Sequence, residues 1–165
     1  MKKTIILLAL FLVNMSITAQ KFGHFDYMEV LSAMPEFATV QSEMETLAKQ
    51  YEDDLKRMQD EFQKKKGALE QQKNLLPNIR QRQEQELQTL LQRIEQTYAD
   101  SEQALQKANA EKMKPLADKI AVAVEKVCEE VDYVYILNTN TGIPFHINTK
   151  HSTDLTADVK KSLGL

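Results

Sequence analysis

Three histidines and one cysteine are the side chains of this sequence that could support metal or nucleophilic chemistry. His24, His146 and His151 lie toward the two ends of the chain, and Cys128 stands in an apolar helical run. No two of them have the spacing of a metal site, and neither a Gly-x-Ser-x-Gly elbow nor a glycine-rich phosphate loop occurs. We therefore expect solvated histidines, an inert thiol, no cofactor, no metal and no enzymatic activity. A metal- or anion-binding enzyme remains an alternative that rests on the histidines alone.

A cluster of basic residues is the sharpest charge feature. Between Phe62 and Gln83, six basic residues stand against Glu70 alone. Charge runs usually form solvated helix faces, but this one lies in a chain of net charge −3. The alternative is an electrostatic contact with an anionic membrane surface or acidic protein segments. The six residues are Lys64, Lys65, Lys66, Lys73, Arg80 and Arg82.

The elements that must position these residues are two long helices. Apolar residues recur at steps of three, four and seven on both sides of Pro77, which is typical of a coiled-coil seam. Pro77 with Asn78 is the one good turn signal between them, because proline cannot donate an interior helix hydrogen bond. The sequence predicts an antiparallel hairpin over residues 35–115 with its tip near residue 77. The seam residues are Met44, Ala48, Tyr51, Leu55, Met58, Phe62, Leu69 and Leu76, then Leu87, Leu90, Leu91, Ile94, Tyr98, Leu105 and Ala108. Past Pro115 the second stripe continues as Leu116, Ile120, Val124 and Val127.

Four residues interrupt this pattern. Lys65 and Gln72 fall at seam positions that should be apolar, and Gly67 costs a helix about 1 kcal/mol relative to alanine. The outer part of the hairpin should therefore be softer than the inner part. Pro115 is expected to kink or break the second helix.

The chain ends carry the strand-forming residues and should build a small body. We expect one strand from Phe22 to about Tyr27, a buried strand at Tyr133–Leu137, and a half-buried strand at residues 143–147. A turn at residues 140–142 would join the last two, and Asp154 would cap a short terminal helix. So small a sheet should need pairing with other copies. The predicted core of the body, shared in a trimer, is Phe25, Val134, Ile136, Phe145 and Ile147.

The first residues have the layout of a secretory signal peptide. Lys2 and Lys3 precede nine apolar residues, 5–13, and cleavage is expected after Ala19. The predicted organisation is a signal peptide at 1–19, a body strand and short helix at 20–34, the hairpin at 35–115, and a helix root, body strands and terminal helix at 116–165. The expected class is α+β, mostly α.

Composition excludes several classes of protein. The 165 residues include only 4 glycines, 4 prolines and 1 cysteine, so neither a collagen-like chain nor a disulfide scaffold is formed. An acidic chain is also a poor candidate for a nucleic-acid binder, and we expect no nucleic-acid partner.

Two end segments resemble the Skp/OmpH family of periplasmic chaperones. One is the short strand ending in Asp26, followed by Val30-Leu31 and by Pro35-Glu36 at the start of the long helix. The other is Tyr135-Ile136-Leu137, followed by the run from Asp154 to Val159. The helical part resembles any coiled coil, so the end segments carry the resemblance.

The resemblance implies a homotrimer in the periplasm. Three helical hairpins would surround a cavity that holds unfolded outer-membrane proteins without ATP, and the basic cluster would contact these proteins or an anionic membrane. The alternative function is that of a structural coiled-coil spacer or tether of the cell envelope. Its sequence signature would be unbroken heptads with no return at Pro77.

Overall fold

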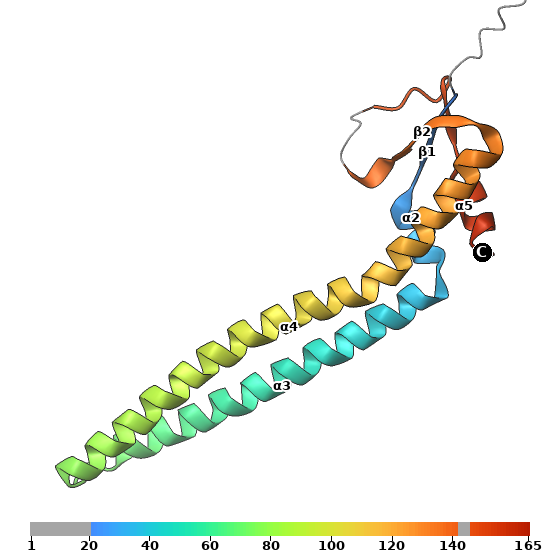
Figure 1. The fold of residues 1–165 in the computed structure, drawn as a ribbon. Helices are drawn as coiled ribbons and strands as arrows, with labels where there is room; N and C mark the ends of the chain where they lie inside the picture. The colour runs from blue at the N-terminus through green and yellow to red at the C-terminus, as the bar shows by residue number, and fades with distance from the viewer. Residues whose placement is uncertain (1–20, 142–145) are drawn as a thin grey trace, which may run out of the picture. The chain divides into compact units, whose positions relative to one another are not determined.

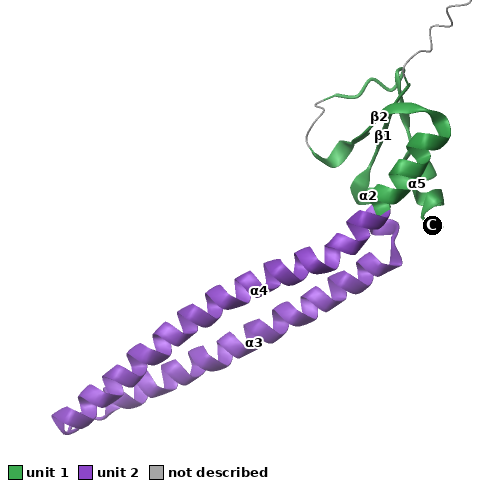
Figure 2. Cartoon of the chain, viewed as in Figure 1, with its two compact units in different colours: residues 1–30, 120–165 green, residues 31–119 purple. Residues whose placement is uncertain are grey.

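The computed structural model describes residues 21–141 and 146–165 (Figure 1). Within them, three short strands and four helices follow one another in the order β1, α2, α3, α4, β2, β3, α5. The chain divides into two compact units (Figure 2). We call residues 31–119 the arm, and the described residues of 21–30 and 120–165 the body.

Two helices form the arm, α3 (Pro35–Gln71) and α4 (Pro77–Val131), the second of which continues into the body. They lie side by side and antiparallel (Figure 1), so the predicted helical hairpin and α+β class are confirmed. Both helices begin with proline, whose missing N–H has no helical partner in a first turn anyway. Residues 72–76 form the turn, and Pro77 starts the second helix just after it.

Pro115 does not break α4, which runs without interruption from Pro77 to Val131. The expectation of a break was wrong. Proline removes one helical hydrogen bond and leaves the carbonyl four residues earlier without its donor. Both Pro115 and Glu111 are exposed, so water can reach that carbonyl.

The body contains a three-stranded parallel sheet in the order β2-β1-β3. The strands are β1 (Lys21–Phe25), β2 (Tyr133–Asn138) and β3 (Ser152–Asp154). The predicted hairpin of two strands is wrong: within the described residues β2 pairs only with β1, in parallel, and parallel neighbours need a long connection, here the intervening helices. Residues 139–141 form a short 3-10 helix, and residues 146 and 147 lie in no strand. The rest of the strand expected at 143–147 lies outside the described residues.

The core of the body is apolar, but β2 contributes little to it. Phe25 is buried, as expected, whereas Ile136 and Ile147 are only half-buried and Phe145 lies outside the described residues. Val134 is 44% exposed, so the prediction of a buried second strand is wrong for the single chain. The reason is that β2 is an edge strand with one neighbour. The buried apolar residues of the body are Phe25, Val30, Ile120, Ala123, Val127, Leu155 and Val159.

A hydrogen bond joins Asp26, which lies between β1 and the helix α2 (Tyr27–Ala33), to the start of the helix α5 (Thr156–Ser162). The Thr156 hydroxyl accepts from the backbone N–H of Asp26 and donates to Asp154 Oδ1. The same Asp154 oxygen also accepts from the Thr156 backbone N–H at 2.9 Å. Asp154 stands one residue before the N-cap of α5, which is Leu155 and not Asp154 as predicted. The Thr156 hydroxyl, and then its N–H, hold the pKa of the Asp154 carboxyl below its usual value.

Gly23 and Gly67 provide a matched pair of alanine substitutions. A Cβ at Gly23 would clash with Leu155, whose side chain is 2% exposed, so Gly23→Ala should destabilise the body by about 1–3 kcal/mol. At Gly67 a Cβ would meet no atom within 4 Å, so Gly67→Ala should stabilise the arm by up to about 1 kcal/mol. Urea unfolding followed by circular dichroism measures both. A Gly23→Ala variant as stable as the parent protein would contradict the packing described.

Candidate functional site

The seam of the arm is covered only in part. Of the seam residues predicted in the arm, only Leu69 and Leu116 are buried, at 8% and 5% exposure. Leu76, Leu91 and Tyr98 are 63%, 43% and 55% exposed, and the others are half-buried. The arm therefore keeps apolar surface along its whole length.

Beside the seam, an apolar groove of about 540 Å³ lies between α3 and α4. Its apolar lining residues are Phe37, Val40 and Met44 from α3 and Met113 from α4. Its polar lining residues are Gln41, Glu45 and Asn109. Methionine side chains are flexible and polarizable, and they adapt to irregular apolar partners. The sequence analysis missed this groove, because Phe37 and Val40 precede the seam that it identified.

A second groove, of about 360 Å³, contains Leu47 among polar residues. Its other lining residues are Ser42, Glu43, Thr46, Gln50 and Lys112. The two grooves thus differ in their lining residues: four of seven are apolar in the first and one of six in the second.

Two ion pairs join the helices of the arm. Lys119 Nζ donates to Glu36 Oε1 at 2.7 Å, and Lys112 Nζ donates to Glu43 Oε2 at 2.5 Å. The two pairs are seven residues apart on each helix, as charged positions flanking an antiparallel heptad seam should be. The hydrogen bond from Lys119 is the main reason why the pKa of Glu36 is lowered. Sequence spacing could have suggested these pairs, but only after the register of the hairpin was known.

The six basic residues of the predicted tip divide into two groups. Arg80 Nη2 donates to the carbonyl oxygen of Gln72 at 2.9 Å, just beyond the last turn of α3. Lys65 pairs with Glu61 at 3.0 Å, and Arg82 Nε lies 3.8 Å from Glu86. The exposed residues Lys64, Lys66 and Lys73 have no ion-pair partner among the described residues.

Acidic neighbours reduce the positive charge of the tip. Between residues 61 and 86, six basic residues stand against four acidic ones, an excess of two rather than the five counted between Phe62 and Gln83. The three lysines without partners carry most of the accessible charge. We call Lys64, Lys66 and Lys73 the free tip lysines.

The seam becomes polar near the tip, as Lys65 and Gln72 predicted. These two residues, with Leu69, line a small cavity of about 140 Å³ between the helices. Gln83 and Glu86 line it from α4. A polar cavity holds the helices together less well than apolar packing would.

The candidate chemical residues do not come together as a metal site. Within the described ranges, no three histidine, cysteine or acidic residues are placed to hold a metal ion. Cys128 is half-buried, and its thiol donates to the carbonyl oxygen of Tyr133 at 3.3 Å. His24 Nδ1 lies 2.8 Å from Ser152 Oγ.

The family of the chain follows from its sequence. Residues 21–163, which include the whole arm, match the protein family described as outer membrane protein (OmpH-like). The chain belongs to the OmpH-like family. The family resemblance of the end segments is thereby confirmed. No curated protein sequence matches the chain.

An OmpH-like crystal structure has the same fold. The protein comes from Caulobacter crescentus and is provisionally named an outer membrane chaperone. Its TM-score to this chain is 0.70 at 12% sequence identity, over 87% of this chain and 83% of that one. At that identity, the similarity establishes the fold.

The role of Arg80 in this OmpH-like arm can be tested at the tip. Arg80→Gln should remove the bond to the Gln72 carbonyl and loosen the end of α3, because terminal carbonyls have no helical donor. Amide hydrogen exchange in residues 68–72 should become several-fold faster. Lys66→Gln removes the same charge and should leave exchange there unchanged. Equal exchange in both variants would show that Arg80 does not hold the turn.

Proposed function

We propose that the mature protein is an ATP-independent holdase chaperone of the periplasm. As a homotrimer, it would hold unfolded outer-membrane proteins in a cavity between its helical arms. The observation that carries this proposal is membership of the OmpH-like family over residues 21–163, combined with an arm whose apolar seam is left partly open. The Caulobacter relative, provisionally named a chaperone, supports it.

The chemistry of the arm suits such a client. An unfolded β-barrel protein exposes alternate apolar side chains and unpaired backbone groups, and it aggregates in water. The groove at Phe37, Val40, Met44 and Met113 can accept apolar side chains of the client. The groove at Leu47 is lined mainly by polar side chains, which can form hydrogen bonds with the unpaired backbone groups of the client. Each contact is weak, but several arms acting together would give high avidity.

The exposed side of the sheet supports assembly through the body. Phe22 and Tyr135 stack at a centroid distance of 6.2 Å, and both are exposed, at 37% and 62%. Val134 and Leu137 are also exposed, on a strand with one open edge. An apolar surface of this kind on a small sheet is best covered by other copies of the chain.

The periplasmic location rests on the predicted signal peptide at residues 1–19, which lies outside the described residues. From residue 21 onward, in the parts that the structure describes, no helix is long and apolar enough to span a membrane. An ATP-independent mechanism agrees with the periplasm, and the sequence carries no phosphate-binding glycine loop.

The rival function, a spacer or tether of the envelope, is less well supported. A spacer gains length from a helix that continues in one direction. In this chain the helix reverses at residues 72–76, so the second helix retraces the first.

The direct test is aggregation of a urea-denatured outer-membrane protein on dilution, followed by light scattering. The mature protein in excess should suppress scattering without ATP. Unchanged scattering would reject the chaperone function and favour the structural alternative.

The free tip lysines should increase the rate at which the arm captures a client. Changing Lys64, Lys66 and Lys73 to Gln should slow client association several-fold at low salt and have little effect at high salt, because exposed charges are screened. A matched control changes Lys49, Lys56 and Lys107 to Gln, with the same loss of charge elsewhere on the arm. Stopped-flow fluorescence of a labelled client measures both. Equal slowing in the two variants would assign the effect to net charge and not to the tip.

The trimer can be tested at Val134. Val134→Asp places a charge on a residue that is exposed in the single chain, so the body should still fold while the assembly dissociates. Ala157→Asp, on the exposed side of α5, is the control with the same added charge. Sedimentation should give single chains for Val134→Asp and trimers for the control. A trimer in both variants would exclude Val134 from the interface.

A further inference from the structure

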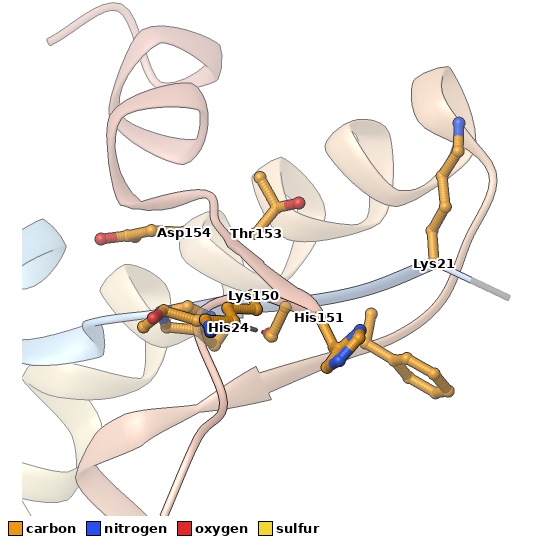
Figure 3. Close-up of a pocket in the computed structure, with 9 residues that line it drawn as sticks. Lys21, His24, Lys150, His151, Thr153 and Asp154 are labelled. Atoms are coloured by element: carbon orange, nitrogen blue, oxygen red, sulfur yellow. Dashed lines mark hydrogen bonds between the residues drawn. The ribbon is translucent and has the colours of Figure 1, made fainter. Parts of the chain in front are cut away.

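A further pocket, of about 590 Å³, lies in the body beside β1 and β3 (Figure 3). Lys21, Phe22 and His24 line it from β1. Residues 149–154, which form β3 and the turn before it, line the other side. The proposed function uses none of these side chains apart from Phe22.

The turn that builds one wall of the pocket is held by Asn148. Its side-chain oxygen accepts from the Lys150 N–H at 3.0 Å, and its backbone carbonyl accepts from the N–H groups of His151 and Ser152. These bonds fix the backbone that carries Lys150 and His151. The two side chains are therefore presented from an ordered turn.

Several hydrogen-bond donors of the pocket have no partner. The Lys150 ammonium group and the His151 ring make no side-chain bond within the described ranges. His24 uses Nδ1 toward Ser152 Oγ, which leaves its second ring nitrogen without a protein partner there. Thr149 and Thr153 add hydroxyl groups. Lys21 is occupied, because its Nζ donates to the Val131 carbonyl at 3.1 Å and points away from the histidines.

Negative charge in the pocket is limited to Asp154. Its Oδ1 already accepts two bonds from Thr156, which are the main causes of its lowered pKa, and the nearby His24 lowers that pKa further. The pocket thus contains two lysines and two histidines against one carboxylate whose hydrogen bonds are directed to α5. Hydrogen-bond donors therefore outnumber negative charges in this pocket, although the whole chain has a net charge of −3.

We propose that this pocket binds an oxyanion of the phosphate class, with Lys150, His151 and His24 as its main donors. A phosphate group has several acceptor oxygens directed to different sides, and it suits donors that come from two strands and a turn. A free phosphate and a phosphate carried by a lipid headgroup share this chemistry. The proposal is independent of the chaperone function.

The test uses the assembled mature protein with nitrogen-15 in its histidines. Titration with inorganic phosphate, at constant ionic strength set by sodium chloride, should shift the imidazole signals of His24 and His151 to saturation. His146 does not line the pocket and should not respond, so it serves as an internal control. Shifts of all three histidines in parallel, or shifts without saturation, would overturn the proposal.

A pair of charge-matched variants adds a second readout. Lys150→Gln should weaken phosphate binding about tenfold, as expected for loss of a charge-assisted hydrogen bond. Lys161→Gln removes the same charge from α5, outside the pocket, and should leave the affinity unchanged. Equal affinities in the two variants would also overturn the proposal. Neither variant should alter suppression of client aggregation, which separates this site from the proposed function.

Vesicles distinguish the two sources of phosphate. Binding to phosphatidic acid vesicles, compared with phosphatidylcholine vesicles, should fall in Lys150→Gln and compete with inorganic phosphate if the ligand is a headgroup. Vesicle binding that is independent of Lys150, alongside saturable binding of inorganic phosphate, would support the site with a free phosphate as its ligand.

Discussion

Two helices can bury only the strip of surface along which they touch, and most features of this chain follow from that constraint. In the arm, residues 31–119, only Leu69 and Leu116 of the seam are buried, and the other seam residues are half-buried or exposed. The apolar contact between α3 and α4 is weak, and the ion pairs of Glu36 with Lys119 and Glu43 with Lys112 help to fix the register of the two helices. Exposed pairs of this kind contribute little stability, so the arm stays thin and adaptable.

The same constraint makes the arm suitable as a binding surface. A protein that buried its seam fully would have little apolar surface for a client, whereas this arm keeps exposed side chains such as Tyr98 and a groove containing Met44 and Met113. Near the tip the seam carries the polar residues Lys65 and Gln72 around the buried Leu69. Apolar contacts are non-directional and depend on buried area, so the arm can adapt these contacts to clients of different shape. Charge acts at longer range and governs approach.

Sequence periodicity was sufficient to predict the arm, because seven-residue spacing and one proline turn are local signals. The body was harder to predict. Strand β3, at residues 152–154, is short and polar, and nothing in its composition marks it as a strand. It forms because β1 offers it an edge and Leu155 packs over Gly23, a contact between residues distant in sequence. Val134 was expected in the core since it is apolar, but its burial depends on which strand lies at the sheet edge. The anion pocket likewise requires His24 and Lys150 to meet across 126 positions, which no local pattern reveals.

The central claim is that several arms hold one client together, and the most direct measurement is the native mass of the complex. The mature protein, mixed without ATP with a denatured outer-membrane protein and then diluted, should give a species containing three copies of this chain and one client. The protein alone should give the mass of three chains. A single chain bound to the client, or a mass unchanged by the client, would contradict the account.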